Sequence, residues 1–179
     1  MITTAFYPMR PMTGPKLTID NVLLITSDYL HRGYILQRKL NGDRVVMIVK
    51  DFGATFWNRY TGIYSFAVNN EWGKLPVGTV MDGEVYQGEY YPFELIQLGK
   101  EKILTTQERV VGAENICRTH NQEYVYGGVT NDWLVGEVMM KHERTSMWEG
   151  VVAKLKSARY EPLNTATQES PAWSRLKWV

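Results

Sequence analysis

The sequence predicts an α+β fold built on antiparallel sheets, and three features of the chain lead to this prediction. Short stretches rich in β-branched and aromatic residues alternate in the manner of strands and are separated by turn dipeptides. Two later stretches carry helix-capping residues and the apolar spacing of helices. The strands come first and the helices then fall between strands, which is typical of α+β proteins.

The expected elements begin at about residue 33 and run to the end of the chain. Turn dipeptides predict two hairpins, one over residues 33–50 around Asn41-Gly42 and one over residues 55–68 around Thr61-Gly62. In chain order the remaining elements are strands at 78–86 and 90–98, helices at 105–119 and 130–143, a strand at 148–157, a polar loop at 159–171 and a final strand at 172–179.

Composition indicates one packed domain. We expect residues 1–179 to form a single unit, and six Trp and eleven Tyr supply material for its core. The formal net charge is +1, so any contact with nucleic acid must come from a local patch. One cysteine excludes a disulfide scaffold and indicates a reducing compartment. Without a signal peptide or an apolar run of ~20 residues, we expect a cytoplasmic protein with no membrane partner.

Lys39 is the first candidate for chemistry, because it lies just before the Asn41-Gly42 turn with Arg38 and Arg44 nearby. Neighbouring cations and partial burial lower the pKa of a lysine and free its amine as a nucleophile. A solvated hairpin lysine is the plainer alternative, and for an isolated lysine it is the more common one.

Acidic residues stand near two further predicted strands. Glu84 follows the turn signal Asp82-Gly83, and a hairpin acid that faces solvent would explain it equally well. Glu149 and Lys154 are five residues apart, so a regular strand places them on opposite faces. A bulge or a twist would be needed for both side chains to face one ligand.

Arg175 and Lys177 are two residues apart on the last strand and therefore share one face. Two cations on one face suit a phosphate or a nucleic-acid backbone, although charges on an edge strand also keep a protein soluble. Each of these groups is a weak signal alone, and their order along the chain carries more weight. That order is Lys39-x-Asn-Gly-x-Arg44, Asn58-Arg59, Asp82-Gly83-Glu84, Phe93-Glu94, Glu149-Gly-Val-Val-x-Lys154 and Trp173-x-Arg175-x-Lys177.

This ordered set resembles the motifs of the covalent nucleotidyltransferases, a superfamily of DNA ligases, RNA ligases and mRNA capping enzymes. The match is best to the adenylation domain of ATP-dependent DNA ligases, and it covers nearly the whole chain. The resemblance implies an ATP-grasp-like nucleotidyltransferase domain of two antiparallel sheets flanked by helices, with the nucleotide in the cleft between the sheets.

The resemblance also implies a reaction and a role for each residue. Lys39 would attack the α-phosphate of ATP to form lysyl-AMP, and the AMP would pass to a 5′-phosphate at a nick in DNA, or in RNA. Glu149, with Glu84, would hold Mg²⁺. The nucleotide would be bound by Gln37, Arg44, Arg59, Glu84, Phe93, Lys154, Arg175 and Lys177.

Several features depart from the family pattern. Asn41 stands in place of the aspartate of the lysine motif, and Gln37 in place of a frequent glutamate. The segment between Glu84 and Phe93 is short, which predicts a tight hairpin. The sequence encodes no oligonucleotide-binding barrel, which leaves three alternatives: a minimal enzyme, a fragment, or a barrel supplied in trans by a partner. An RNA ligase, a capping-type nucleotidyltransferase and a non-catalytic nucleic-acid-binding module are the alternatives.

Overall fold

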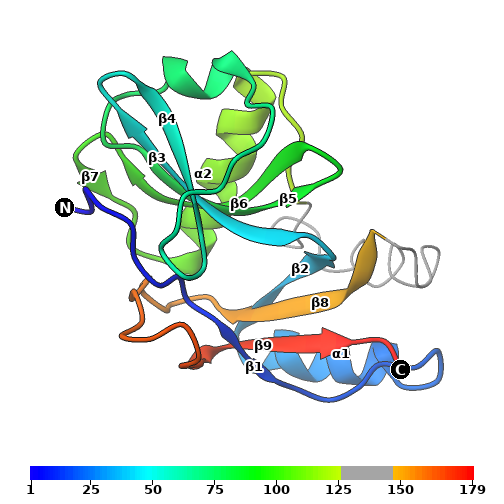
Figure 1. Ribbon diagram of the computed structural model, residues 1–179. Helices are drawn as coiled ribbons and strands as arrows, with labels where there is room; N and C mark the ends of the chain where they lie inside the picture. Colours follow the sequence, from blue (N-terminus) through cyan, green and yellow to red (C-terminus); the bar gives the residue numbers. More distant parts are fainter. Residues whose placement is uncertain (126–146) are drawn as a thin grey trace.

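The chain folds into two β-sheets that lie one above the other (Figure 1). The computed structural model describes residues 1–125 and 147–179. Its elements are β1 (Pro11–Thr13), α1 (Val22–His31), β2 (Tyr34–Leu40), β3 (Asp43–Lys50), β4 (Gly53–Asn58), a 3-10 helix (Asn70–Lys74), β5 (Val80–Tyr86), β6 (Glu89–Leu98), β7 (Glu101–Lys102), α2 (Thr106–Thr119), β8 (Trp148–Leu155) and β9 (Ser170–Lys177).

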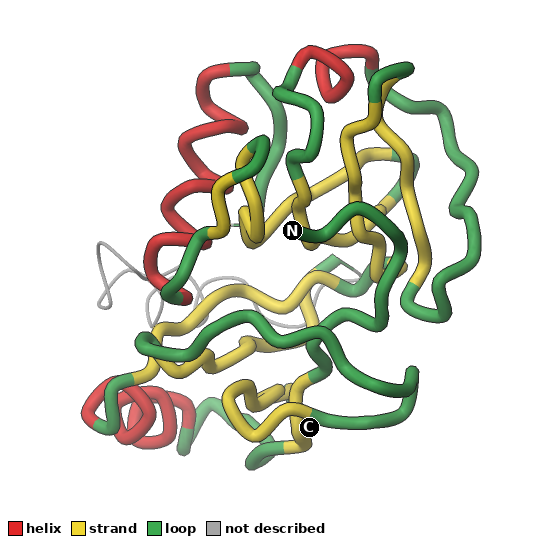
Figure 2. Tube along the Cα trace, turned by 90° about the vertical axis from the view of Figure 1, so that its left-hand side faces the viewer, coloured by secondary structure: helices red, strands yellow, loops and turns green. Residues whose placement is uncertain are grey.

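The upper sheet has five strands in the order β4-β3-β5-β6-β7, and the lower sheet has four in the order β1-β9-β8-β2. Helix α2 packs on β6 of the upper sheet, and α1 packs on β2 of the lower one. Figure 2 shows the same two layers from the side, with α1 at the bottom. The prediction of an α+β fold with two sheets and flanking helices is confirmed, with the difference that β1 pairs parallel to β9.

Both helices are fixed by apolar faces and, for α2, by a complete cap. Thr105 accepts a hydrogen bond from the Glu108 amide while the Glu108 carboxylate accepts one from the Thr105 amide, which is the capping box of a helix start. Ala113 and Cys117 of α2 pack on the upper sheet, so the helix predicted over 105–119 is confirmed. The helix predicted over 130–143 lies outside the described residues.

The hairpin predicted around Asn41-Gly42 is wrong. Strand β2 pairs with β8 in the lower sheet and β3 pairs with β4 and β5 in the upper sheet, so the dipeptide carries the chain from one sheet to the other. Neither residue has the positive φ that a two-residue hairpin turn of this sequence requires. Their amides donate instead to the Met147 carbonyl at 2.8 Å and to the Glu84 carboxylate at 3.0 Å.

Three other turn predictions have mixed outcomes. Of the hairpin predicted over 55–68, the first strand and the turn are confirmed, with Thr61 at φ +67, but the residues after the turn form only an isolated antiparallel bridge between Trp57 and Ile63 and no strand. The tight hairpin expected between the motifs at 84 and 93 is also confirmed, since β5 and β6 pair directly with each other. Asp82-Gly83 is not a turn, because both residues lie inside β5.

Four elements were not predicted: β1 and α1 in the N-terminal segment, the 3-10 helix and the two-residue strand β7. Helix α1 was missed because exposed Leu23 and Leu24 interrupt its apolar face, and its N-cap residue, Asn21, makes no side-chain capping bond. Strand β1 is only three residues long. In the described part of the chain no helix is long and apolar enough to cross a membrane.

Candidate active site

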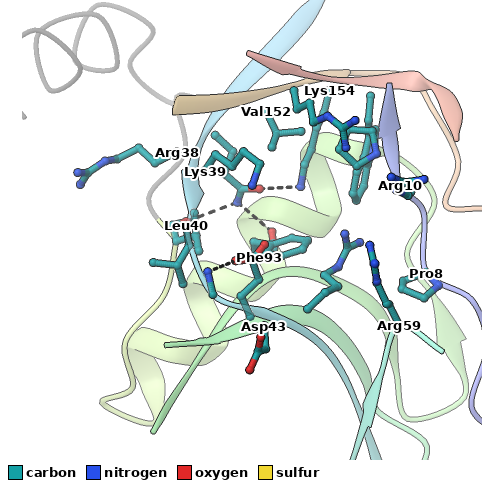
Figure 3. Close-up of a pocket in the computed structure, with 18 of the residues that line it drawn as sticks. Pro8, Arg10, Arg38, Lys39, Leu40, Asp43, Arg59, Phe93, Val152 and Lys154 are labelled. Carbon is teal, nitrogen blue, oxygen red and sulfur yellow. Dashed lines mark hydrogen bonds between the residues drawn. The ribbon is translucent and has the colours of Figure 1, made fainter. Parts of the chain in front are cut away.

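A cavity of about 430 Å³ lies between the two sheets. Strands of both sheets and the N-terminal segment supply its walls (Figure 3). Eight of the ten predicted site residues line it: Gln37, Lys39, Arg44, Arg59, Glu84, Phe93, Lys154 and Arg175. The other two, Glu149 and Lys177, lie outside the lining but connect to it through Lys39.

Glu149 forms ion pairs with two lysines at once. Its Oε1 lies 2.5 Å from Nζ of Lys39 and its Oε2 lies 2.6 Å from Nζ of Lys177. Burial raises the pKa of this carboxyl, but hydrogen bonds from both lysines outweigh burial and lower the pKa below its ordinary value. The cation expected beside Lys39 faces elsewhere, because Arg38 points away in Figure 3 and stacks 3.7 Å from the Trp148 ring centroid.

A β-bulge in β8 aims Glu149 at Lys39. Lys39 pairs with Gly150 but the next residue, Leu40, pairs with Trp148, so Glu149 is the extra residue on its strand. Gly150 has φ +146, and a side chain there would collide with the carbonyl of the neighbouring strand β9. The bulge that the five-residue spacing of Glu149 and Lys154 required is therefore present.

Lys154 is almost fully buried at the inner end of the cavity. Its Nζ donates to Oε1 of Gln37 at 2.6 Å, lies 3.6 Å from Oε2 of Glu94, and stands over the rings of Phe93 and Trp173 at 4.3 and 4.1 Å. Burial lowers the pKa of this lysine to about 8. The amine is thus placed between carboxamide, carboxylate and two aromatic faces, where the neutral and charged forms differ little in free energy near neutral pH.

Arg44 is held by a bidentate bond to Asp82, with Nε–Oδ1 and Nη2–Oδ2 distances both of 2.6 Å. A third bond of 2.7 Å joins its Nη2 to the Met9 carbonyl. Burial would lower the pKa of this guanidinium, but the Asp82 carboxylate raises it well above its ordinary value. Tyr160 also donates to Asp82, at 2.6 Å. The Arg44 charge is therefore fixed in position at the cavity wall.

Glu84 of β5 lies beside the Asn41-Gly42 segment that carries the chain from one sheet to the other. Its Oε2 accepts the Gly42 amide at 3.0 Å. Burial raises the pKa of this carboxyl to about 7, against the opposing effect of the Lys39 and Arg44 cations. Glu84 therefore changes charge in the neutral range, unlike Glu149.

Arginines line the mouth of the cavity. Arg10 and Arg59 lie across it from Lys39 (Figure 3). Arg59 donates to the Tyr60 hydroxyl and lies 4.6 Å from that ring's centroid. Arg175 donates to Thr13 Oγ1 at 2.6 Å. Arg10 was not among the predicted residues, and it joins the site only because the N-terminal segment crosses both sheets.

A buried ion pair behind the cavity was also missed. Nε of Arg109 lies 2.9 Å from Oε1 of Glu94, and both side chains are 0% exposed. The helical spacing could have indicated this ion pair. Arg109 lies on the same buried face of α2 as Thr106 and Ala113, and a cation on a buried face needs a buried partner.

Carboxylates suitable for Mg²⁺ are few in this site. The described part of the chain holds no group of three or more His, Cys, Asp or Glu side chains gathered for a metal. Mg²⁺ commonly takes one or two carboxylates together with waters and substrate phosphates. Glu149 and Glu84 interact electrostatically with each other and fit that requirement, provided that the nucleotide supplies phosphate oxygens.

Comparison with known proteins gives matches among solved structures alone. No protein-family model and no curated sequence matches the chain. A mycobacterial DNA ligase D complexed with ATP and MES aligns with a TM-score of 0.66 at 16% identity, over 96% of this chain and 60% of that one. The ligase domain of LigD from M. tuberculosis aligns with a TM-score of 0.63 at 16% identity, over 96% and 59%.

A third match is the ATP-dependent DNA ligase from bacteriophage T7 in complex with ATP, with a TM-score of 0.54 and 12% identity over 96% of this chain and 68% of that one. This chain spans about three fifths of the length of the two mycobacterial structures. All three alignments extend over 96% of this chain. The chain has the fold of the nucleotidyltransferase domain of ATP-dependent DNA ligases.

Proposed function

We propose that this chain is the core of an ATP-dependent polynucleotide ligase acting on DNA. In the first step the Nζ of Lys39 bonds to the α-phosphorus of ATP, the bond to the β-phosphate oxygen breaks, and pyrophosphate leaves. In the second step the AMP passes to a 5′-phosphate at a nick. In the third step the 3′-hydroxyl attacks that phosphate and AMP leaves.

The convergence of the predicted residues carries the proposal. Lys39, Arg44, Glu84, Phe93, Lys154 and Arg175 come from six different strands of two sheets, yet they line one cavity. A shared cavity of nucleophile, cations and an aromatic ring is what transfer from a nucleotide requires, because such catalysis is mostly positioning and charge stabilisation.

Glu149 and Lys177 would act around the nucleophile. The amine attacks only in its neutral form, and Glu149 Oε1, at 2.5 Å from Nζ, is the nearest carboxylate for its proton. Once Lys39 carries AMP, its ion pair with Glu149 is lost and that carboxylate becomes available to Mg²⁺, with Glu84 as a second oxygen donor. Bound Mg²⁺ would supply charge neutralisation on the phosphates.

Phe93 and Trp173 would bind the base. Both rings are part of the buried cluster that joins the two sheets, and Phe93 also lines the cavity. Gln37 is 2% exposed and donates its carboxamide to the Phe93 carbonyl at 3.0 Å, which fixes the polar edge of this region. A stacked base beside a fixed amide gives the cavity a means to select one purine.

Labelling with ATP tests the proposal directly. The chain is incubated with α-labelled ATP and Mg²⁺, and the mass of the intact protein is measured to detect the addition of one AMP. Wild type should gain the label at Lys39, which peptide mapping would locate. Lys39→Ala and Lys39→Arg should both gain none, since neither carries a primary amine at this position.

Lys39→Arg is the matched control, because it keeps a cation beside Glu149 and so separates loss of the nucleophile from loss of the ion pair. Its circular dichroism spectrum and melting temperature should stay close to those of wild type, since the Lys39 side chain is at the edge of the core. A label that persists in Lys39→Arg would disprove the assignment of the nucleophile.

A further inference from the structure

A second cavity, of about 240 Å³, lies beside the first. It is lined by Thr13, Gly14, Lys16, Arg175 and Lys177. Arg175 lines both cavities. Three cations and one hydroxyl face this space, and among the described residues no carboxylate or aromatic side chain lines it. Such a lining selects an anion of phosphate type rather than a metal ion or a base.

The lining is built on paired strands and is therefore rigid. Thr13 of β1 stands opposite Arg175 of β9 in the parallel register. Backbone bonds from Gly14 N to Arg175 O, at 3.0 Å, and from Leu17 N to Lys177 O, at 2.8 Å, hold the chain on both sides of Lys16. The position of Lys16 relative to the two cations of β9 is thus set by the main chain.

Two of the three cations already have acidic partners, and Lys16 has none within the described residues. Arg175 lies 3.6 Å from Glu169, and Lys177 lies 2.6 Å from Glu149. The cations of this lining and the ion pairs connected to them hold five cations against two carboxylates: Arg10, Lys16, Lys39, Arg175 and Lys177 against Glu149 and Glu169. This excess contrasts with a net charge of +1 for the whole chain.

We propose that the second cavity binds a phosphate of the acceptor strand, next to the phosphate that receives AMP, with Lys16 as its free cation. The inference rests on the proposed function, because the bridge from Lys177 through Glu149 to Lys39 places this cavity beside the reacting group. The terminal phosphate of ATP offers the same chemistry. The strand is favoured because the first cavity holds its own cations for a nucleotide, whereas Lys16 is exposed and lies outside it.

The test compares binding of a labelled nicked duplex by wild type, Lys16→Ala and Lys100→Ala, in EDTA and without ATP, over a range of KCl concentrations. Lys100 is an exposed lysine between β6 and β7 and serves as the matched control. Each phosphate contact contributes about 0.9 to the slope of log K against log salt for duplex DNA. Lys16→Ala should lower that slope by about one contact, and Lys100→Ala should leave it unchanged.

A second measurement separates the two sources of phosphate. AMP labelling of the same variants is followed against ATP concentration. An unchanged binding slope with a raised KM for ATP in Lys16→Ala would overturn the strand assignment in favour of the nucleotide. No effect on either quantity, or no binding of nicked duplex by wild type at low salt, would overturn the phosphate site itself. Wild type that binds the duplex with the expected Lys16 dependence yet never gains AMP would refute the proposed function and leave this site in place.

Discussion

At the scale of single residues, the charged groups around the cavity differ in whether they can change charge near neutral pH. Glu149 is kept ionised by two lysines, and Arg44 is kept charged by Asp82. Glu84 and Lys154 are different, because burial moves the pKa of the carboxyl up to about 7 and that of the amine down to about 8. The cavity therefore combines fixed charges with two groups that can take up or lose a proton during a reaction at neutral pH.

Glu84 should make the stability of the fold depend on pH. Its folded pKa of about 7 is above the ordinary value of about 4.3, so the folded chain keeps a proton that the unfolded chain has lost between these values. The stabilisation is complete below about pH 4.3 and is lost as the pH rises through 7. Glu84→Gln stays neutral, so its free energy of unfolding should rise relative to wild type between pH 5 and pH 8.

Urea unfolding at pH 5, 6, 7 and 8 would measure this difference. Glu101→Gln is a suitable control, because Glu101 is an exposed carboxylate on β7, and its difference from wild type should not change with pH. Parallel curves for wild type and Glu84→Gln would show that the folded protein holds Glu84 ionised throughout.

At the scale of single elements, local sequence signals identified strands and helix caps well but not the partners of each strand. The strands predicted at 78–86 and 90–98 and the capped helix predicted at 105–119 depend on neighbours in sequence, and all three predictions are confirmed. Asn41-Gly42 gives the same local signal as a hairpin turn, but β2 and β3 pair with strands far along the chain. Pairing of that kind is decided by packing of the whole sheet and not by the dipeptide.

The bulge in β8 offers a test at this scale. Gly150→Ala requires an alanine at φ +146 and brings its Cβ within 2.9 Å of the Lys177 Cα. Strand β9 must then move away, and the Glu149 side chain is no longer directed toward Lys39. We expect a loss of stability of about 1–3 kcal/mol from the strained backbone, with more from the lost pairing, and little AMP labelling.

Gly33→Ala is the matched control, since Gly33 also has a positive φ, of +85, but a Cβ there meets nothing within 4 Å. It should show backbone strain of about 1 kcal/mol and keep wild-type labelling. Denaturant unfolding and the AMP-labelling assay on both variants give the comparison. Equal labelling by the two variants would mean that the bulge does not position Glu149.

At the scale of the whole molecule, the site could be predicted from the order of the motifs along the sequence, but not from the spacing within any one motif. Spacing alone left Glu149 and Lys154 on opposite faces of a strand, and the resemblance to ligases was needed to place them together. The contacts that hold the site were harder to foresee. Arg44 with Asp82 and Arg109 with Glu94 join residues from separate elements, and a buried partner of this kind is decided only when the elements pack.

The cavity also joins the two sheets, which gives a test of nucleotide binding for the whole fold. A buried cluster of Met9, Leu40, Phe93, Val125 and Trp173 spans the sheets beside the cavity. A nucleotide in the cavity would touch both sheets, so it would bind the folded state of the chain and not the unfolded state. At a ligand concentration of one hundred times Kd this linkage stabilises the fold by about 2.7 kcal/mol.

For a chain of this length that stabilisation corresponds to a rise in Tm of about 5–10 °C. We expect ATP to produce it and GTP to produce much less, measured by thermal unfolding in EDTA so that no covalent adduct forms. Lys39→Arg should show the same ATP shift, which would confirm that the signal reports binding and not adenylation. An equal shift with GTP would favour a capping-type nucleotidyltransferase, and no shift with either nucleotide would favour a module that binds nucleic acid without catalysis, because a cavity that binds no nucleotide cannot supply AMP to Lys39.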